Sequence, residues 1–189
     1  MNDLTESAAL RSKYKKRRRL SVAFLCAVCV FSLFFGTWRS VSAQRDKVEE
    51  VFYGDMGIDY DLKVRSEQAY NMVTVANKYL RSGHEAVEKV LDARMELDNA
   101  GTISEKYSAN KYLTEATASL DELLSGLKLE DKDRNTLSAI SAQLMSSNST
   151  IGHNEYNSLA RRFNTRIMGS FPAGILARLT GIKKLELFT

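Results

Sequence analysis

The residues of this chain best suited to chemistry are two histidines and a scattering of carboxylates. His84 and His153 lie on different segments, and neither has a cysteine or a second histidine at metal-ligand spacing. Metal sites in helical bundles pair a glutamate with a histidine three residues on, and carboxylates such as Glu85 and Asp98 lack that partner. The chain has no nucleophile elbow, glycine-rich phosphate loop, His-Glu-x-x-His or EF-hand pattern. We therefore predict no enzyme, no metal site and no cofactor.

The two cysteines, Cys26 and Cys29, both lie inside a long apolar run. In that setting a Cys-x-x-Cys pair is typical of small apolar packing residues and not of a redox or metal site. Leu25 and Val28 precede them, so neither cysteine follows the small residue that a lipoprotein anchor requires. The rest of the chain has no cysteine, and its stability must come from helix packing without disulfides.

An aromatic residue followed by asparagine is the pattern that most suggests a selected role. It occurs as Tyr156-Asn157, Phe163-Asn164 and Tyr70-Asn71. The first two pairs are seven residues apart, which places both asparagines on one face of a helix. Asparagine is unfavourable inside a helix, so we expect each to find a hydrogen-bonding partner across a helical core. A polar cluster that binds a ligand is the alternative interpretation.

The element that organises the chain is an uncharged run from Leu20 to Trp38. As a helix its 19 residues would extend about 28 Å, close to the thickness of a bilayer's hydrocarbon core. The run has no polar face at helical spacing, which argues against a buried helix of a soluble protein. Trp38 closes it with the side chain that favours the membrane interface. We predict a single transmembrane helix.

The charges on either side of this run predict its orientation. Seven cations precede it: Arg11, Lys13, Lys15, Lys16, Arg17, Arg18 and Arg19. With Asp3 and Glu6 they give residues 1–19 a charge of +5, while the remaining residues sum to −1 from 20 basic and 21 acidic side chains. The positive-inside bias predicts a cytoplasmic N-terminus and an exported remainder without the basic charge of a nucleic-acid-binding protein. The tail would act as a topology signal or would also attract anionic lipids.

A motif for signal-peptide cleavage follows the span. Val41-Ser42-Ala43 has the small residues that signal peptidase recognises, so cleavage after Ala43 would release a secreted protein. Against cleavage, the apolar run is longer than the core of a typical signal peptide. We favour a retained signal anchor and keep the secreted form as the alternative.

Beyond the span, the composition and periodicity predict long helices. Residues 44–53 continue as a short helix that the Gly54–Gly57 stretch breaks. A heptad seam then predicts one helix from Ile58 to Asn99, with Gly83 explained by close packing or a local bend. Its small and apolar members are Leu62, Ser66, Ala69, Val73, Ala76, Leu80, Gly83, Val87, Val90 and Leu97, with Arg94 among them. Such a seam pairs helices within one chain or between copies, so it fits a monomer and a homo-oligomer equally.

Two further helical segments follow. Thr102 and Glu105 form a capping-box pattern that opens a helix ending near Ser125-Gly126. An apolar stripe then runs from Leu137 to Met168, and its weak middle, residues 146–152, predicts either a kink or an inter-helix turn. Phe171-Pro172 ends it, and a short amphipathic basic piece closes the chain.

These elements predict an all-α protein, with a single N-terminal transmembrane helix followed by an elongated antiparallel bundle of three to four helices. The expected divisions are a basic cytoplasmic tail (1–19), the membrane helix (20–38), a juxtamembrane helix with its glycine break (39–57) and the bundle (58–189).

Two groups of residues make the chain resemble the bacterial LemA family. The first group is Ile58-Asp59-Tyr60-Asp61-Leu62-Lys63-Val64-Arg65, Asn71-Met72-Val73 and Ala93-Arg94. The second is Tyr156-Asn157, Phe163-Asn164, Phe171-Pro172, Gly181-Ile182 and Phe188. The chain departs from the family pattern at Val64-Arg65, where the family has paired arginines, and it lacks the family's proline before Asn71.

This resemblance covers about residues 45–189 and implies one N-terminal membrane helix followed by a helical bundle. It implies no established catalytic activity. The family's N-terminus has been predicted to lie outside the cell, whereas the charge asymmetry here predicts the opposite, and we keep the charge-based prediction.

The favoured function is therefore a non-enzymatic, membrane-anchored scaffold or adaptor of the bacterial cell envelope, placed as a single-pass protein with its bundle outside. Its partners would be the membrane and an envelope protein, with no nucleic acid and no metal. A ligand-sensing bundle that uses Asn157 and Asn164 is the alternative from another class, beside the secreted form.

Overall fold

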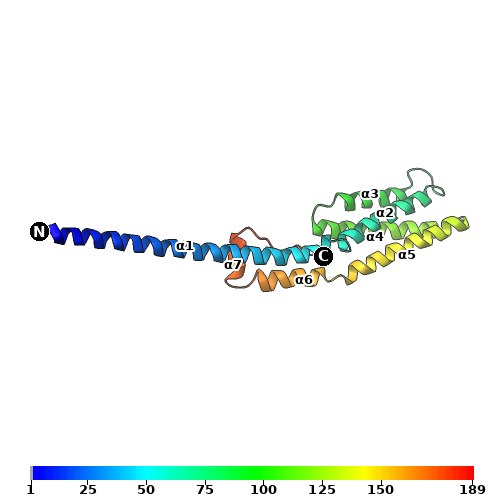
Figure 1. Ribbon diagram of the computed structural model, residues 1–189. Coiled ribbons are helices and arrows are strands. Elements are labelled where there is room, and N and C mark those ends of the chain that lie inside the picture. Colours follow the sequence, from blue (N-terminus) through cyan, green and yellow to red (C-terminus); the bar gives the residue numbers. More distant parts are fainter. Residues whose placement is uncertain (1) are drawn as a thin grey trace. The chain divides into compact units, whose positions relative to one another are not determined.

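The computed structural model describes residues 2–189, with side chains from Tyr14 onward. Every regular element in that range is helical, which confirms the all-α prediction. In chain order (Figure 1) they are α1 (Asn2–Tyr53), α2 (Ile58–Ala76), α3 (Glu85–Asn99), α4 (Ile103–Ser125), α5 (Asp131–His153), α6 (Tyr156–Arg162), the π-helical turn η1 (Phe163–Ile167) and α7 (Ala173–Leu179). The side chains of Arg11 and Lys13, two of the predicted topology residues, lie outside the described part.

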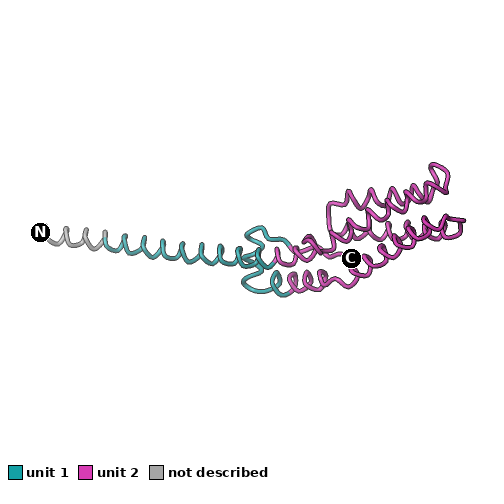
Figure 2. Tube along the Cα trace, turned by 45° about the vertical axis from the view of Figure 1, so that its right-hand side comes forward, with its two compact units in different colours: residues 1–44, 166–183 teal, residues 45–165, 184–189 magenta. Residues whose placement is uncertain are grey.

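The chain forms two compact units, coloured separately in Figure 2. One contains residues 1–44 and 166–183, and the other contains residues 45–165 and 184–189. Helix α1 belongs to both, because its last turns, beyond Gln44, are part of the second unit.

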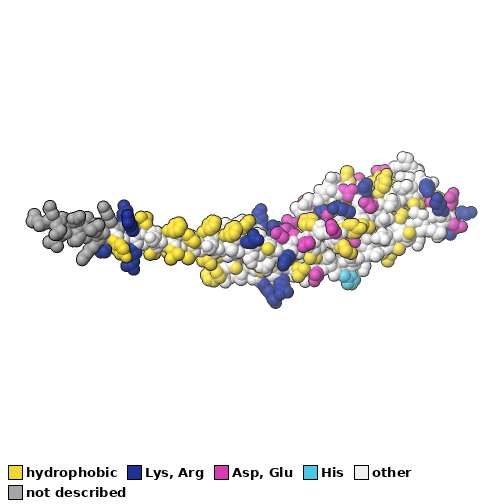
Figure 3. All heavy atoms as spheres, viewed as in Figure 1, with side chains coloured by type: hydrophobic (Ala, Val, Ile, Leu, Met, Phe, Trp, Pro, Cys, Tyr) yellow, Lys and Arg dark blue, Asp and Glu magenta, His cyan; other side chains and the backbone are white. Residues whose placement is uncertain are grey.

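The first unit consists mainly of one long exposed helix. Most of the large apolar side chains between Leu20 and Trp38 are exposed along this stretch of α1 (Figure 3). The small core of this unit contains Val41 of α1 together with Met168, Ala177 and Ile182. Gly174 belongs to the same core, because a Cβ there would clash with the Met168 carbonyl.

The second unit is held together by α2, which packs against α3, α4 and α5, while α3 also packs against α4. The predicted seam faces this core: Leu62, Ala69 and Val73 of α2 and Val90 and Leu97 of α3 are buried. The apolar face of α4 meets them with Leu113, Leu120 and Leu124, all completely buried.

The prediction of one helix from Ile58 to Asn99 is wrong, because the chain leaves the helix after Ala76 and re-enters it at Glu85. Gly83 adopts a φ of 71°, a conformation that glycine accepts without strain and that no helix contains. The His84 side chain then accepts a hydrogen bond from the Ala86 N–H and caps α3. The heptad spacing continues across the break, since the turn returns the chain to the same core.

Two other predicted features are the capping box at Thr102–Glu105 and the weak helical stretch at residues 146–152. The capping box is confirmed, with Thr102 Oγ1 accepting from the Glu105 N–H at 3.1 Å and Glu105 Oε2 accepting from the Thr102 N–H at 2.9 Å. Residues 146–152 do not form the inter-helix turn, because α5 continues to His153 and the turn follows at Asn154-Glu155. Ser147 and Ile151 are buried, and that burial keeps a weak helical sequence in the helix.

Candidate functional site

The most unusual side chain of the second unit is a buried arginine at the centre of α2. Arg65 is only 1% exposed, and its guanidinium donates three hydrogen bonds, all to neutral acceptors. The acceptors are Asn110 Oδ1 at 2.7 Å and Thr114 Oγ1 at 2.7 Å, both on α4, and the Leu144 carbonyl of α5 at 2.6 Å. One side chain therefore connects α2 to both α4 and α5.

Burial lowers the pKa of Arg65 to about 10, and the nearby charge of Asp61 only partly opposes this effect. The group still stays protonated at neutral pH, and each of its three recorded contacts requires it to donate. A buried cation bonded only to neutral groups keeps much of its desolvation cost, so this position can accept further negative charge.

A cavity of 190 Å³ lies beside this guanidinium. Its lining includes Arg65 and Met72 from α2, Thr114, Thr117 and Asp121 from α4, and Ser141, Leu144, Met145 and Asn148 from α5. The lining thus combines one buried positive charge, several small hydroxyl and amide groups, and one carboxylate.

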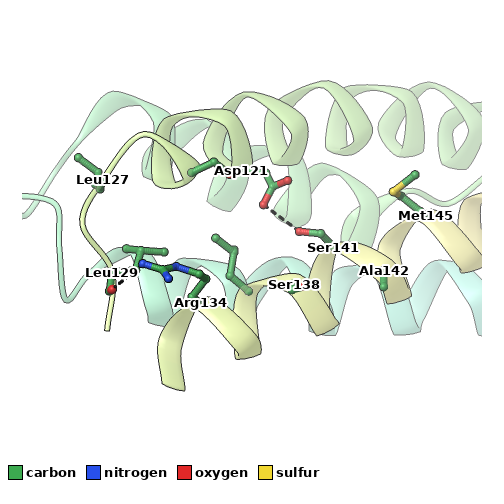
Figure 4. Close-up of a pocket in the computed structure, with 10 residues that line it drawn as sticks. Asp121, Leu127, Leu129, Arg134, Ser138, Ser141, Ala142 and Met145 are labelled. Atoms are coloured by element: carbon green, nitrogen blue, oxygen red, sulfur yellow. Dashed lines mark hydrogen bonds between the residues drawn. The ribbon is translucent and has the colours of Figure 1, made fainter. Parts of the chain in front are cut away.

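A wider pocket of 480 Å³ continues along the same two helices and shares Asp121, Ser141 and Met145 with the cavity. Figure 4 shows Asp121 of α4 and Ser141 of α5 meeting across it, with the Ser141 hydroxyl donating to the carboxylate at 2.8 Å. At one end Arg134 donates to the Leu129 carbonyl at 3.3 Å, and at the other lies the exposed Met145. We name the two pockets together the α4–α5 groove.

The two asparagines of the repeated aromatic–Asn pattern hold the end of the chain. Asn157 donates to the Phe188 carbonyl at 2.9 Å and accepts from the Phe188 N–H at 2.8 Å. Asn164 makes the same pair of bonds with Leu185, both at 2.8 Å. Each side-chain amide therefore pairs with both backbone groups of one residue, and we call this arrangement the C-terminal clamp.

An aromatic cluster surrounds the clamp. Phe188 is buried, with its ring centroid 5.8 Å from Phe52 and 5.2 Å from Tyr107, and Tyr156 lies 5.1 Å from Phe52. The Tyr156 hydroxyl donates to the Glu186 carbonyl at 2.8 Å, and burial raises the pKa of this phenol to about 12. The Glu186 carboxylate accepts from the Ile103 N–H at 3.1 Å, so the last residues also cap α4.

The expected partners are thus present for two of the three asparagines. Asn157 and Asn164 bond to other parts of the chain, which agrees with the structural interpretation and not with a ligand-binding one. For Asn71 the expectation is wrong, because its exposed side chain contacts only Gln68 of the same helix, at 3.4 Å.

The remaining predicted residues are dispersed. Leu62 is buried in the core, and Arg94 donates to Ser66 at 3.1 Å with its guanidinium 5.0 Å from the Tyr70 ring. Phe163 is buried next to the clamp, whereas Phe171 and Pro172 are exposed in the first unit. Along α1, Leu20, Trp38 and the basic residues Lys15, Lys16, Arg17, Arg18 and Arg19 are exposed. His84 caps α3 and His153 is exposed, and no cluster of potential metal ligands occurs in the described part of the chain.

Sequence reasoning missed the α4–α5 groove and the acceptors of Arg65. A signal did exist in α4, where Asn110 occupies a position of the apolar stripe that contains Leu113 and Leu120. A polar residue in such a stripe needs a buried hydrogen-bonding partner. Asn110 lies 45 residues from Arg65, so the sequence alone does not identify Arg65 as that partner.

Comparison with known protein families gives a match to the part of the chain that follows α1. The sequence model of the LemA family matches residues 55–189, a range that contains the groove, the clamp and every resembling residue from Ile58 to Phe188. No curated protein matches the chain.

Proposed function

The chain belongs to the LemA family, and from this membership and the exposed apolar surface of α1 we propose a membrane-anchored, non-enzymatic adaptor of the bacterial envelope. In this proposal one transmembrane helix is followed by an antiparallel helical bundle that binds another envelope protein.

The observation that carries the proposal is the exposed apolar surface of α1. Leu20, Phe24, Phe31 and Leu33 are each more than half exposed, which is unfavourable for so many large apolar side chains in water. This helix is long and apolar enough to cross a membrane, by its length and composition. A bilayer around residues 20–38 would remove these side chains from water.

The structure also supports an anchor that is retained. Helix α1 is continuous from Asn2 to Tyr53 and so includes the Val41–Ala43 cleavage motif. Val41 is only 3% exposed in the core of the first unit. Cleavage after Ala43 would require local unfolding of the helix and would remove Val41 from that core.

The orientation follows from charge. The described cations Lys15 to Arg19 are exposed directly before the apolar stretch, so they favour a cytoplasmic N-terminus and an exported bundle. We place the protein in the cell membrane as a single-pass protein on this basis.

The α4–α5 groove is the surface that we propose for the protein partner. It is open and offers hydrogen-bonding groups of both kinds, with the apolar Leu127, Leu137 and Met145 beside them. This combination suits a peptide segment of a partner, whose backbone needs donors and acceptors and whose side chains need apolar contact.

A cysteine-labelling experiment tests the anchor and its orientation. Ser119 is exposed on α4, and Ser119→Cys should react with a membrane-impermeant maleimide on intact cells, in a full-length band that pellets with membranes. Cys26 and Cys29 should stay unlabelled inside the lipid. Labelling only after lysis would place the bundle in the cytoplasm, and a labelled band in the supernatant would show release.

Photo-crosslinking tests the groove. A photoreactive phenylalanine analogue at Met145, which is 74% exposed in the groove, should give a defined crosslinked envelope protein. The matched control is the same analogue at Met95 on α3, which is 57% exposed and outside the groove. Equal crosslinking at both positions would refute a specific site in the groove.

A second function is favoured by the buried charge of Arg65 next to the 190 Å³ cavity: the sensing of a small carboxylate ligand. A panel of small carboxylates should then raise the Tm of the full chain, and Arg65→Lys should abolish this shift because an ammonium lacks the guanidinium's fork of donors. The absence of any shift across the panel would leave Arg65 with a structural role.

A further inference from the structure

Three large apolar side chains of the first unit share an outward face near the C-terminus. Phe171 is 85% exposed, Ile175 50% and Leu179 69%. They are spaced four residues apart, with Phe171 in the turn before α7 and the other two one helical turn apart within it. Outside the apolar stretch of α1, these three side chains form a patch of exposed apolar surface on the first unit.

The opposite face of α7 is already used in packing. Gly174 and Ala177 are buried, and the space at Gly174 is closed by the Met168 carbonyl. The helix is therefore docked through its small residues, and its large apolar residues are the ones left in solvent. Packing inside the unit does not account for this arrangement.

The charge of this segment has one sign. Residues 166–183 include Arg166, Arg178 and Lys183 and no aspartate or glutamate, and all three cations are exposed. Arg178 is held in place by donating to the Met168 carbonyl at 2.9 Å, one residue before Leu179 of the apolar face. Apolar side chains next to cations, without acidic residues, are typical of helices that lie on anionic membrane surfaces.

The position of α7 agrees with that chemistry. The segment that contains α7 (residues 166–183) lies beside α1 in both views (Figures 1 and 2), and Val41, which is buried in the same unit, comes three residues after Trp38, where the apolar run ends. Three residues of helix advance the chain by about 4.5 Å, so α7 stands at the level of the lipid headgroups if residues 20–38 cross the membrane.

We propose that α7 is a second membrane contact, which inserts Phe171, Ile175 and Leu179 at the boundary of headgroups and acyl chains and places Arg166, Arg178 and Lys183 on anionic lipid phosphates. The inference rests on the proposed transmembrane anchor. A helix of 7 residues is too short to bind a bilayer alone, but attachment to a membrane helix gives it a high local concentration at the surface. The contact would fix the orientation of the first unit on the membrane.

Lipid-based quenching in the full chain tests the proposal. With Cys26 and Cys29 replaced by alanine, Ile175→Cys carries an environment-sensitive fluorophore in nanodiscs of phosphatidylcholine and phosphatidylglycerol. Some of the lipids carry a nitroxide near the headgroup end of the acyl chain. Quenching at residue 175 should be at least about threefold stronger than at the control Ser119→Cys, because only the former would reach the lipid.

Two reporters separate this inference from the anchor on which it rests. A variant that keeps Cys29 and replaces only Cys26 reports the span through lipids with a nitroxide deep in the acyl chain. If Cys29 is quenched but residue 175 matches Ser119, the α7 contact is refuted and the anchor stands. If Cys29 is not quenched, the anchor itself fails, and the α7 proposal fails with it.

Two further measurements test the role of charge and the alternative of a protein that covers this face. Replacing Arg166 and Lys183 by glutamine should reduce the quenching at residue 175 in anionic nanodiscs, since each basic residue near such a surface changes partitioning about fivefold. If the label at residue 175 is not quenched by lipid but is shielded from aqueous iodide in native membranes only, a protein covers this face and the lipid proposal is overturned.

Discussion

The second unit connects its elements in two different ways, through interior hydrogen bonds and through an ion pair at its edge. Among the first, the buried Arg65 and the half-buried Asn157 and Asn164 each make at least two bonds to groups far away in the sequence. At the edge, Asp133 at the start of α5 accepts from Lys78 Nζ and from the Tyr79 hydroxyl, each at 2.7 Å. Both donors belong to the turn between α2 and α3.

The difference lies in what replaces each bond when it is lost. Water can reach Lys78, whose side chain is 54% exposed, and Asp133, although its side chain is only 7% exposed, keeps the Tyr79 hydroxyl as a second donor when the ion pair breaks. The carbonyl of Leu144 and the amide of Asn110, in contrast, belong to residues that are each only 6% exposed, so little water can take the place of Arg65. Interior polar contacts should therefore dominate stability, while the edge contact mainly positions the turn.

Replacement of Arg65 by methionine should have the largest effect. It leaves buried acceptors on α4 and α5 without a donor, and we expect the free energy of unfolding to fall by about 3 kcal/mol. Urea titration of the full chain in detergent, followed by circular dichroism, measures this change against Arg81→Met, an exposed control expected to stay within about 0.5 kcal/mol. A loss below about 1 kcal/mol for Arg65→Met would mean that burial of the charge cancels its bonds.

The clamp should rank second. Asn157→Ala and Asn164→Ala each remove two hydrogen bonds, so each should cost about 2 kcal/mol. Hydrogen exchange gives a residue-specific test: Asn157→Ala should expose the Phe188 amide first, and Asn164→Ala the Leu185 amide. Asn71→Ala, at an exposed helical position, is the matched control, and equal effects at all three positions would contradict the clamp.

Two glycine substitutions should change stability in opposite directions. Gly83→Ala forces a side chain into a positive φ of 71° at the edge turn and should cost about 1 kcal/mol. Gly152→Ala lies within α5 and should stabilise by about 0.5 kcal/mol. A Cβ at either position meets no atom within 4 Å, so the difference isolates backbone conformation. If both alanine variants were more stable than the parent chain, the result would favour the original prediction of a single helix from Ile58 to Asn99.

The pH dependence should be the smallest effect and should come from two paired carboxyls, Asp133 at the edge and Asp59 in the first turn of α2. Hydrogen bonds from Lys78 and then Tyr79 lower the pKa of Asp133. For Asp59, burial alone would raise the pKa, but the hydrogen bonds from Lys106 and Lys63 outweigh burial and lower it. A carboxyl whose pKa is lower in the folded state stabilises the fold above its ordinary pKa, and this contribution disappears as the pH falls through the folded-state value.

The urea midpoint should therefore decline below about pH 4, where aspartate begins to protonate. Asp133→Asn should make that decline shallower, because asparagine cannot gain a proton. The exposed Asp92→Asn is the control and should leave the slope unchanged. An identical decline in Asp133→Asn and in the parent chain would assign the acid sensitivity to other carboxyls.

Much of the helical structure could be read from local sequence. The Thr102–Glu105 capping box, the helix stop at Gly126 and the break after Tyr53 all depend on residues within one or two turns, and each is confirmed. The buried faces of α2, α3 and α4 likewise follow from periodicity.

The turn at residues 77–84 and the continuous α5 could not be read in the same way. The heptad spacing is unbroken through residues 77–84 and so predicted a helix there. The serine-rich stretch from Ser146 predicted an interruption within α5. In both cases contacts with distant residues decided the outcome: Asp133 binds the turn, and the buried Ser147 and Ile151 hold α5 in its helix.

By itself, the sequence determined the helical class, the apolar stretch of α1, the side of each helix that faces the core and the family to which the chain belongs. These depend on composition and on spacing along a single helix. Only the tertiary structure decided which groups satisfy Arg65, Asn157 and Asn164, since their partners lie between 21 and 79 residues away. A polar side chain in the sequence indicates that a hydrogen-bonding partner is needed. Only the packing of distant segments brings the donor and the acceptor within 3 Å of each other.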